Sequence, residues 1–392
     1  MQGHGAFLDG YDFLSVFPGL GLLARGALAK EGQPRATGRR GSRRQTGYHG
    51  PMVALTATED RASRKAVGIW LLCVALLIAI MVSVGGLTRL TGSGLSITEW
   101  KPVTGVVPPL SDQAWNDAFT DYQRIPQYKL ENHGMSLAQF KGIYWWEWAH
   151  RFLGRFIGLA FLLPFLWFVS RGAIKRADVP RMTMLFVLGG LQGAVGWWMV
   201  ASGLETRVSV SQYRLAAHLG MAILLLGAMI WIALDYLRGR ARRHPAKGAF
   251  VLMGLIYLQI LLGALVAGLH GGLIYNTWPS MDGRLLPEGA FFAQPWWLNI
   301  FENAGLAQFN HRIGAYVIAT LVAAIWFAGR GLNGATRRTQ HLLLALTGFQ
   351  IVLGIFTLLH QAPVALSALH QATAAALFSA AVWHAFEMRY RV

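Results

Sequence analysis

The sequence predicts an all-α polytopic membrane protein in which eight transmembrane helices form two pseudo-symmetric four-helix bundles. Three observations support this fold class: the composition, eight long apolar runs and an internal repeat. Of the 392 residues, 54% are hydrophobic and only 14% are charged, whereas a soluble domain carries about 25% charged residues. The formal net charge of +17 is spread over tails and short loops, which argues against nucleic acid as a partner.

Eight apolar runs are each long enough to cross roughly 30 Å of hydrocarbon as a helix. In order they are Val67–Leu87, Trp146–Val169, Met182–Ala201, Leu215–Leu234, Ala249–Leu269, Phe309–Ala328, His341–Leu359 and Leu366–Phe386. Two longer segments, Thr88–Trp145 and His270–Gln308, separate some of these spans and are rich in Gly, Pro, Trp and Asn. We expect compact structure in both segments, over the mouths of the two bundles.

The basic residues of the tails and short loops predict the orientation of the chain. They are Arg61, Arg64, Lys65, Arg171, Lys175, Arg176, Arg181, Arg238, Arg240, Arg242, Arg243, Lys247, Arg330, Arg337, Arg338, Arg389 and Arg391. With eight spans, all of them lie on one side of the membrane. The positive-inside rule then predicts a multi-pass protein of the cell inner membrane with both termini in the cytoplasm; the mitochondrial inner membrane is the alternative.

Four segments follow from this pattern. Residues 1–66 form a basic N-terminal extension that we expect to be disordered and cytoplasmic, because it contains no long apolar run. Residues 67–235 form the first bundle, residues 236–248 a cytoplasmic linker, and residues 249–392 the second bundle with a short cytoplasmic tail. The single cysteine, Cys73, excludes a disulfide within the chain and makes a cysteine-based metal site implausible.

The two bundles are related by an internal repeat. The matching elements are Trp148-Ala149-His150-Arg151 with Phe309-Asn310-His311-Arg312, Gln192 and Gly196 with Gln350 and Gly354, His218 and Trp231 with His370 and Trp383, and Gly86-Leu87 with Gly268-Leu269. Each half contains an even number of spans, so the two halves have the same orientation in the membrane. The sequence therefore predicts a parallel repeat.

Four histidines lie at repeated places in this pattern: His150, His218, His311 and His370. They belong to alternate spans, so all four enter the membrane from the same side and at a similar depth. An ionisable residue inside a membrane is costly and usually functional, and neutral imidazole is a good ligand for heme iron. The arrangement predicts one bis-histidine metal or heme site in each half. Packing or hydrogen bonding alone is the alternative interpretation.

The two halves differ beside these histidines. Glu147 precedes His150 by three residues, and Gln308 stands at the corresponding place before His311. A carboxylate can accept a proton or stabilise a developing cation, whereas an amide can only form hydrogen bonds. We therefore expect the first bundle to be reactive and the second to hold a resident redox cofactor. The alternative is that Glu147 is a helix-start residue favoured by the helix dipole.

Arginines follow two of the histidines, at Arg151 and Arg312. A guanidinium group binds carboxylates through two parallel hydrogen bonds, so these side chains are candidates for heme propionates. Snorkelling toward the membrane surface is the alternative.

The sequence resembles the heme A synthase family over roughly residues 65–388. The motifs that carry the resemblance are Gly85-Gly86-Leu87-Thr88-Arg89-Leu90-Thr91-Gly92-Ser93-Gly94-Leu95-Ser96, Thr98-Glu99-Trp100-Lys101-Pro102-Val103-Thr104-Gly105, Glu147-Trp148-Ala149-His150-Arg151, Asn276-Thr277-Trp278-Pro279-Ser280-Met281-Asp282-Gly283 and Asn310-His311-Arg312-Ile313-Gly314-Ala315-Tyr316. One form of the family has a cysteine pair in the first outer loop. This chain has none, and it is similar to the form found in proteobacteria and mitochondria.

The resemblance implies a function and a role for each candidate residue. The family oxidises the C8 methyl group of heme O, through an alcohol, to the formyl group of heme A for cytochrome oxidase. It implies that His150, His218 and Arg151 bind the substrate heme, and that His311, His370 and Arg312 bind a resident heme b. It also implies that Glu147 is the catalytic carboxylate. Membrane lipid surrounds such a protein, and the resemblance implies a working link to heme O synthase and cytochrome oxidase assembly factors. A homo-oligomer is compatible with the sequence.

Two other functions fit part of the pattern. A di-heme electron-transfer cytochrome b would use four histidines, but it usually places its hemes at different depths and has no need of Glu147 in one half and Gln308 in the other. A transporter built from parallel repeats would need broken helices and a polar pathway at the membrane midplane. The spans show little of either.

Overall fold

The computed structural model describes residues 51–239 and 243–390, with side chains from residue 61 onward, and over these residues it contains helices and no named strand. Eight of the described helices are long and apolar enough to cross a membrane. They are α1 (Pro51–Leu90), α4 (Leu137–Ser170), α5 (Val179–Ala201), α6 (Gln212–Arg238), α7 (Lys247–Gly268), α9 (Ala304–Ala328), α10 (Gly334–Leu359) and α11 (Val364–Arg389). The prediction of an all-α protein with eight spans is confirmed.

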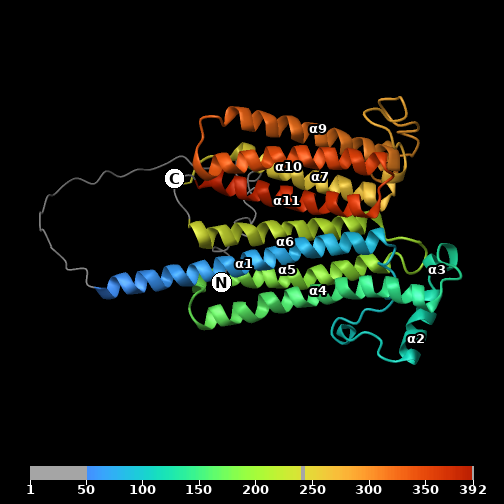
Figure 1. Cartoon of the computed structure of the whole chain (residues 1–392), viewed down its shortest axis with the longest axis horizontal. Helices are drawn as coiled ribbons and strands as arrows, with labels where there is room; N and C mark the ends of the chain where they lie inside the picture. The colour runs from blue at the N-terminus through green and yellow to red at the C-terminus, as the bar shows by residue number, and fades with distance from the viewer. Residues whose placement is uncertain (1–50, 240–242, 391–392) are drawn as a thin grey trace, which may run out of the picture.

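The long helices pack in two groups of four (Figure 1). Helices α1, α4, α5 and α6 form the first group, and α7, α9, α10 and α11 form the second. The groups meet where α1 and α6 pack against α7 and α11, and one apolar core that includes Leu71, Ile223, Ile256 and Phe378 runs through both. The symmetry between the groups stays a prediction, so correspondences below are stated residue by residue.

Glycines allow the two groups to approach closely. A Cβ atom at Gly220 of α6 would meet Tyr257 of α7, and one at Gly227 would meet Phe378 of α11. Glycine matters here because helices in lipid associate through close packing and polar contacts rather than through the hydrophobic effect.

The sequence pair Gly86 and Gly268 also lies between the groups. Gly86 of α1 faces Gln371 of α11, and Gly268 of α7 faces Gln212 of α6. The Gln371 amide donates a 2.6 Å hydrogen bond to the Val82 carbonyl of α1. Each of these two glycines therefore accommodates a glutamine from the other group.

Both long loops are compact and lie at the same end of the molecule (Figure 1). The first contains α2 (Asp112–Gln123) and α3 (Pro126–Leu130), which pack on the start of α4 through Trp115, Tyr122 and Phe140. The second contains three short helices, η5 (Gly271–Leu273), η6 (Trp296–Leu298) and α8 (Asn299–Glu302). Burial raises the pKa of the Tyr122 hydroxyl, which donates to Gln127 inside the first loop.

Helix α4 begins at Leu137, well before the predicted start of the second span at Trp146. A capping box formed by Ser136 and Gln139 fixes this start, and the added turns pack on the first loop rather than on lipid. Glu147 therefore lies about three turns inside the helix. Its interpretation as a helix-start residue is wrong.

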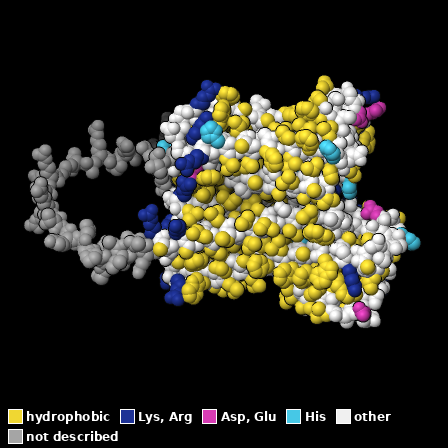
Figure 2. Space-filling view, viewed as in Figure 1, with side chains coloured by type: hydrophobic (Ala, Val, Ile, Leu, Met, Phe, Trp, Pro, Cys, Tyr) yellow, Lys and Arg dark blue, Asp and Glu magenta, His cyan; other side chains and the backbone are white. Residues whose placement is uncertain are grey.

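Helix α1 begins at Pro51, before the predicted first span. Of the extension predicted to be disordered over residues 1–66, residues 51–66 belong to α1, and residues 1–50 lie outside the described residues. The lysine and arginine side chains gather at the end of the molecule where α1 begins and α11 ends, while hydrophobic side chains cover the middle (Figure 2). Ion pairs at this end join Arg181 to Asp235 and Arg238 to Glu387.

Candidate functional site

Each of the four predicted histidines faces a glycine on a neighbouring helix. His150 of α4 faces Gly85 of α1, His218 of α6 faces Gly196 of α5, His311 of α9 faces Gly263 of α7, and His370 of α11 faces Gly354 of α10. A Cβ atom added at any of these glycines would lie between 2.8 and 3.1 Å from an imidazole atom. The glycines therefore provide the space that the rings occupy.

The structure brings His311 and His370 together as a pair. Their ring centroids lie 6.4 Å apart with an interplanar angle of 69°. Two imidazoles bound to opposite sides of one metal ion would have centroids roughly 6.3 Å apart, given metal–nitrogen bonds of about 2.0 Å. The buried Nδ1 atom of His370 has no hydrogen-bond partner. The ring separation and the donor atoms therefore fit two histidines that would hold one heme iron.

His150 of α4 and His218 of α6 are the corresponding histidines of the first group. Gly85, which faces His150, is followed by Gly86, which faces Gln371 beside His370. The two pairs therefore lie at a similar level along the helices. Among the described residues, no group of three or more His, Cys, Asp or Glu side chains is placed to hold a bare metal ion.

Three of the four histidines are held by a glutamine side chain. Gln192, Gln259 and Gln350 each lie four residues before the glycine that faces the histidine. Each amide nitrogen donates to the histidine's backbone carbonyl, at 2.9, 2.7 and 3.0 Å for His218, His311 and His370. Each also lies 3.1 to 3.3 Å from a nitrogen of the same ring.

The sequence prediction paired Gln192 with Gln350 but missed Gln259. The sequence contains a pattern that identifies Gln259, because Gln-x-x-x-Gly occurs in α5, α7 and α10 alike. The fourth histidine, His150, faces Gly85 of α1, and the residue four before that glycine is Met81. His150 is therefore the histidine without a matching glutamine.

Glu147 is 2% exposed and accepts four hydrogen bonds. Its Oε2 atom accepts from the Ser96 hydroxyl and the Ile97 amide, both at 2.8 Å. Its Oε1 atom accepts from Nε and Nη2 of Arg151 at 3.0 and 2.6 Å. The carboxylate therefore joins α4 to the segment that follows α1.

Gln308 makes the corresponding connection in the second group. Its amide nitrogen donates to the carbonyls of Gly271 and Ile274 at 2.7 and 2.6 Å, and its oxygen accepts from Arg312. An amide and a carboxylate thus occupy matching places, and each holds the long loop of its own group. Gln308 holds its loop through hydrogen bonds without a charge, so holding a loop from this place does not in itself require a charged side chain.

Arg151 and Arg312 also contact the two long loops. Arg151 donates to the carbonyls of Ile97 and Glu99 in addition to Glu147. Arg312 donates to the carbonyls of Tyr275 and Ser280, and its buried Nε atom has no partner. Neither side chain simply extends to the membrane surface. Arg312 retains a donor for an incoming anion, whereas Nε of Arg151 is already bound to Glu147.

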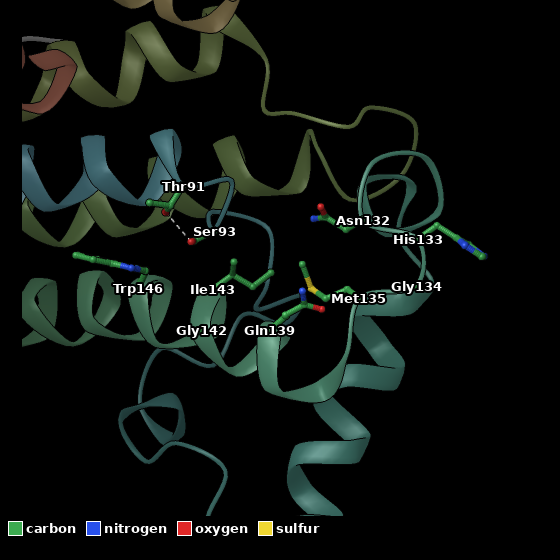
Figure 3. Close-up of a pocket in the computed structure, with 10 residues that line it drawn as sticks. All are labelled: Thr91, Ser93, Asn132, His133, Gly134, Met135, Gln139, Gly142, Ile143 and Trp146. Atoms are coloured by element: carbon green, nitrogen blue, oxygen red, sulfur yellow. Dashed lines mark hydrogen bonds between the residues drawn. The ribbon is translucent and has the colours of Figure 1, made fainter. Parts of the chain in front are cut away.

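Two further features lie at the end of the helices that carries the long loops. His270 follows α7, and burial together with the charge of Arg89 lowers its pKa below the usual value of 6.5. A pocket of about 580 Å³ lies where the first loop meets α4, between Ser93, Asn132, Gln139 and Trp146 (Figure 3). None of the four histidines lines this pocket.

We expect Gly354→Ala to disturb the second histidine pair. The added Cβ would lie 2.9 Å from His370, so the ring must move out of line with His311. Disturbing the residues around a metal ligand typically lowers affinity by roughly 10–100-fold, and the heme content of the purified variant measures this. Gly348→Ala, on the same helix with nothing within 4 Å, is the matched control. Equal heme content in both variants would contradict the role given to Gly354.

Comparisons with known proteins identify the family of the chain. Residues 68–382 match the model of the COX15-CtaA family, described as cytochrome oxidase assembly protein. The heme A synthase of Parvibaculum lavamentivorans is 54% identical over 326 residues, covering 82% of this chain and 94% of that protein. The heme A synthases of Bradyrhizobium diazoefficiens and Rhodopseudomonas palustris are 53% and 50% identical, over 81% and 82% of this chain and 90% and 89% of their own lengths. The chain belongs to the COX15-CtaA family of cytochrome oxidase assembly proteins.

Proposed function

We propose that this chain is a heme A synthase, which oxidises the C8 methyl group of heme O to a formyl group. The observation that carries the proposal is the pair of histidine sites, each built from two helices of one group and both at the same level. The names of relatives that are 50 to 54% identical along most of the chain support it. A di-heme electron carrier would leave the difference between Glu147 and Gln308 unexplained.

His311 and His370 are the proposed ligands of a resident heme b. Their rings lie 6.4 Å apart, so both could hold one heme iron, and both rings are held by glutamines. His150 and His218 are the proposed ligands of the substrate heme in the first group. When bound, the resident heme supplies one-electron redox chemistry close to the substrate.

Glu147 is the proposed catalytic carboxylate. Oxidation of a methyl group moves protons as well as electrons, and a carboxylate one helical turn from His150 can exchange a proton with a reacting group. Ser96 can free the carboxylate for this proton exchange, because its hydroxyl can rotate away from Oε2 of Glu147 and expose that oxygen. The Arg151 guanidinium keeps the other oxygen in place.

Arg151 and Arg312 are the proposed partners of the heme propionates. Each lies one residue after a proposed ligand, near the outer loops. Arg312 has an unpartnered Nε atom, while Arg151 would have to exchange a loop carbonyl for the propionate.

We further propose that the chain lies in the cell inner membrane with both ends in the cytoplasm. The basic side chains at the end where α1 begins support this orientation (Figure 2). The histidines then lie toward the outer leaflet. A functional link to heme O synthase follows from the substrate, since that enzyme class must supply heme O.

The proposal is tested by expressing the chain together with a heme O synthase in cells that lack heme A. Hemes are extracted from the membranes and separated by chromatography. We expect heme A to appear when the chain is present and heme O to persist when it is absent. Heme O that accumulates in the presence of the folded chain, with no heme A, would refute the proposed activity.

A further inference from the structure

The four histidines differ in how firmly their rings are fixed. For His218, His311 and His370, one amide nitrogen binds both the ring and the backbone carbonyl of the same residue. Two contacts from one donor restrict rotation of the ring about its side-chain bonds. A residue that orients a ligand in this way raises the affinity of the metal site, commonly by 10–100-fold.

The three glutamines also have an unused acceptor. The Oε1 atoms of Gln192, Gln259 and Gln350 are buried and have no hydrogen-bond partner. An imidazole that binds iron through one nitrogen carries a proton on the other and needs an acceptor for it. A half-turn of the amide exchanges its oxygen and nitrogen, so each glutamine can accept that proton in place of the hydrogen bond that it donates to the histidine's backbone carbonyl. Each glutamine can therefore contact its ring in both states, as a donor to the free imidazole and as an acceptor from the iron-bound one.

Met81 occupies the fourth place but cannot act in this way. Its thioether has no donor and is only a weak acceptor, so it fixes neither orientation of the His150 ring. Both side chains lie against a glycine of the helix that carries the histidine: a Cβ at Gly154 of α4 would lie 3.2 Å from Met81 Cε, and one at Gly314 of α9 would meet the Gln259 amide. Methionine and glutamine have similar lengths, so the chemical group and not the space distinguishes the two places.

We propose that Gln192, Gln259 and Gln350 are positioning residues for three heme ligands, and that Met81 leaves His150 as the ligand that releases the exchangeable heme. This inference rests on the proposed function, in which the first group takes up substrate and gives up product. The second group, with two fixed ligands, keeps its heme. The first group combines fixed His218 with free His150, so a heme there can be held on one side while the other side opens.

The test is Met81→Gln, which installs the missing amide. The full-length protein is purified after expression with a heme O synthase, and heme loss is followed by transfer to excess apomyoglobin. Extraction and chromatography distinguish heme O and heme A, which belong to the first group, from heme b, which belongs to the second. We expect Met81→Gln to slow release of heme O and heme A by roughly 10–100-fold, with unchanged release of heme b.

Two variants serve as matched controls. Met81→Leu changes the same position without adding an amide and is expected to release heme O and heme A as the wild type does. Gln259→Met performs the converse change in the second group and is expected to speed the release of heme b alone. It also shifts the low-spin heme signal in electron paramagnetic resonance, because that signal depends on the orientation of the two axial rings.

The inference is overturned if Met81→Gln releases heme O and heme A at the wild-type rate, or if Gln259→Met leaves both heme b release and its spectrum unchanged. Failure of the proposed function gives a different result. In that case wild-type chain would never contain heme A, whatever the release rates of the variants.

Discussion

Replacing His370 with alanine is expected to empty the second group of its heme. The variant loses one of the two proposed heme ligands, whose rings stand 6.4 Å apart, and neither Gln350 nor Gly354 supplies another iron ligand in its place. Heme b per purified chain should fall from about one toward zero. Heme A formation should stop as well, since the substrate loses its electron-transfer partner. Optical spectra and extracted heme content measure the change.

His360→Ala is the matched control for this experiment. His360 is an exposed histidine directly after α10, and its ring contacts the Phe356 carbonyl rather than the His311 and His370 pair. It should retain full heme b content. Retention of heme b by His370→Ala, at the level of His360→Ala, would show that the resident heme is not held by this pair.

Glu147→Gln is expected to abolish heme A formation while the resident heme b is retained. Loss of a general acid or base lowers a rate by roughly 10²–10⁴-fold. The loop should stay in place to a large extent, because Gln308 shows that an amide at this position can bind both a loop and the following arginine. One contact is lost, since an amide nitrogen cannot accept from the Ile97 amide. Heme A and heme b in isolated membranes are the measurements.

Gln308→Glu is the reciprocal variant. A carboxylate there would face the carbonyls of Gly271 and Ile274, so the second loop should loosen while the chemistry of the first group remains. Full activity in Glu147→Gln would remove the carboxylate from the mechanism. Equal loss of activity in both variants would show that loop anchoring, rather than charge, is what Glu147 contributes.

Much of the fold could be predicted from the sequence because lipid imposes simple constraints. The eight apolar runs had to be helices, and the four histidines stood out as ionisable residues inside them. The predicted start of the second span, at Trp146, was wrong because α4 begins earlier. Residues 137–145 carry apolar side chains, such as Phe140 and Tyr144, that pack on the first loop and not on lipid. Hydropathy does not distinguish these two uses.

The candidate ligands could be predicted from the sequence, but the residues that surround them could not. Gln259 was missed because no glutamine repeats it in α1, where Met81 stands at the same distance before the glycine that faces the histidine. The contacts of Arg151 and Arg312 with loop carbonyls depend on how each loop folds back over its helix, which no spacing in the sequence reports. The assignment of substrate and resident heme to the two pairs stays a prediction.

The central claim is that the first histidine pair holds exchangeable substrate and the second holds a resident heme. It is tested most directly by identifying the hemes that remain bound to two purified double variants, each expressed with a heme O synthase. His150→Ala with His218→Ala should contain heme b and no heme O or heme A. His311→Ala with His370→Ala should lack heme b. Heme b that persists in the second variant, or disappears from a folded first variant, would contradict the assignment.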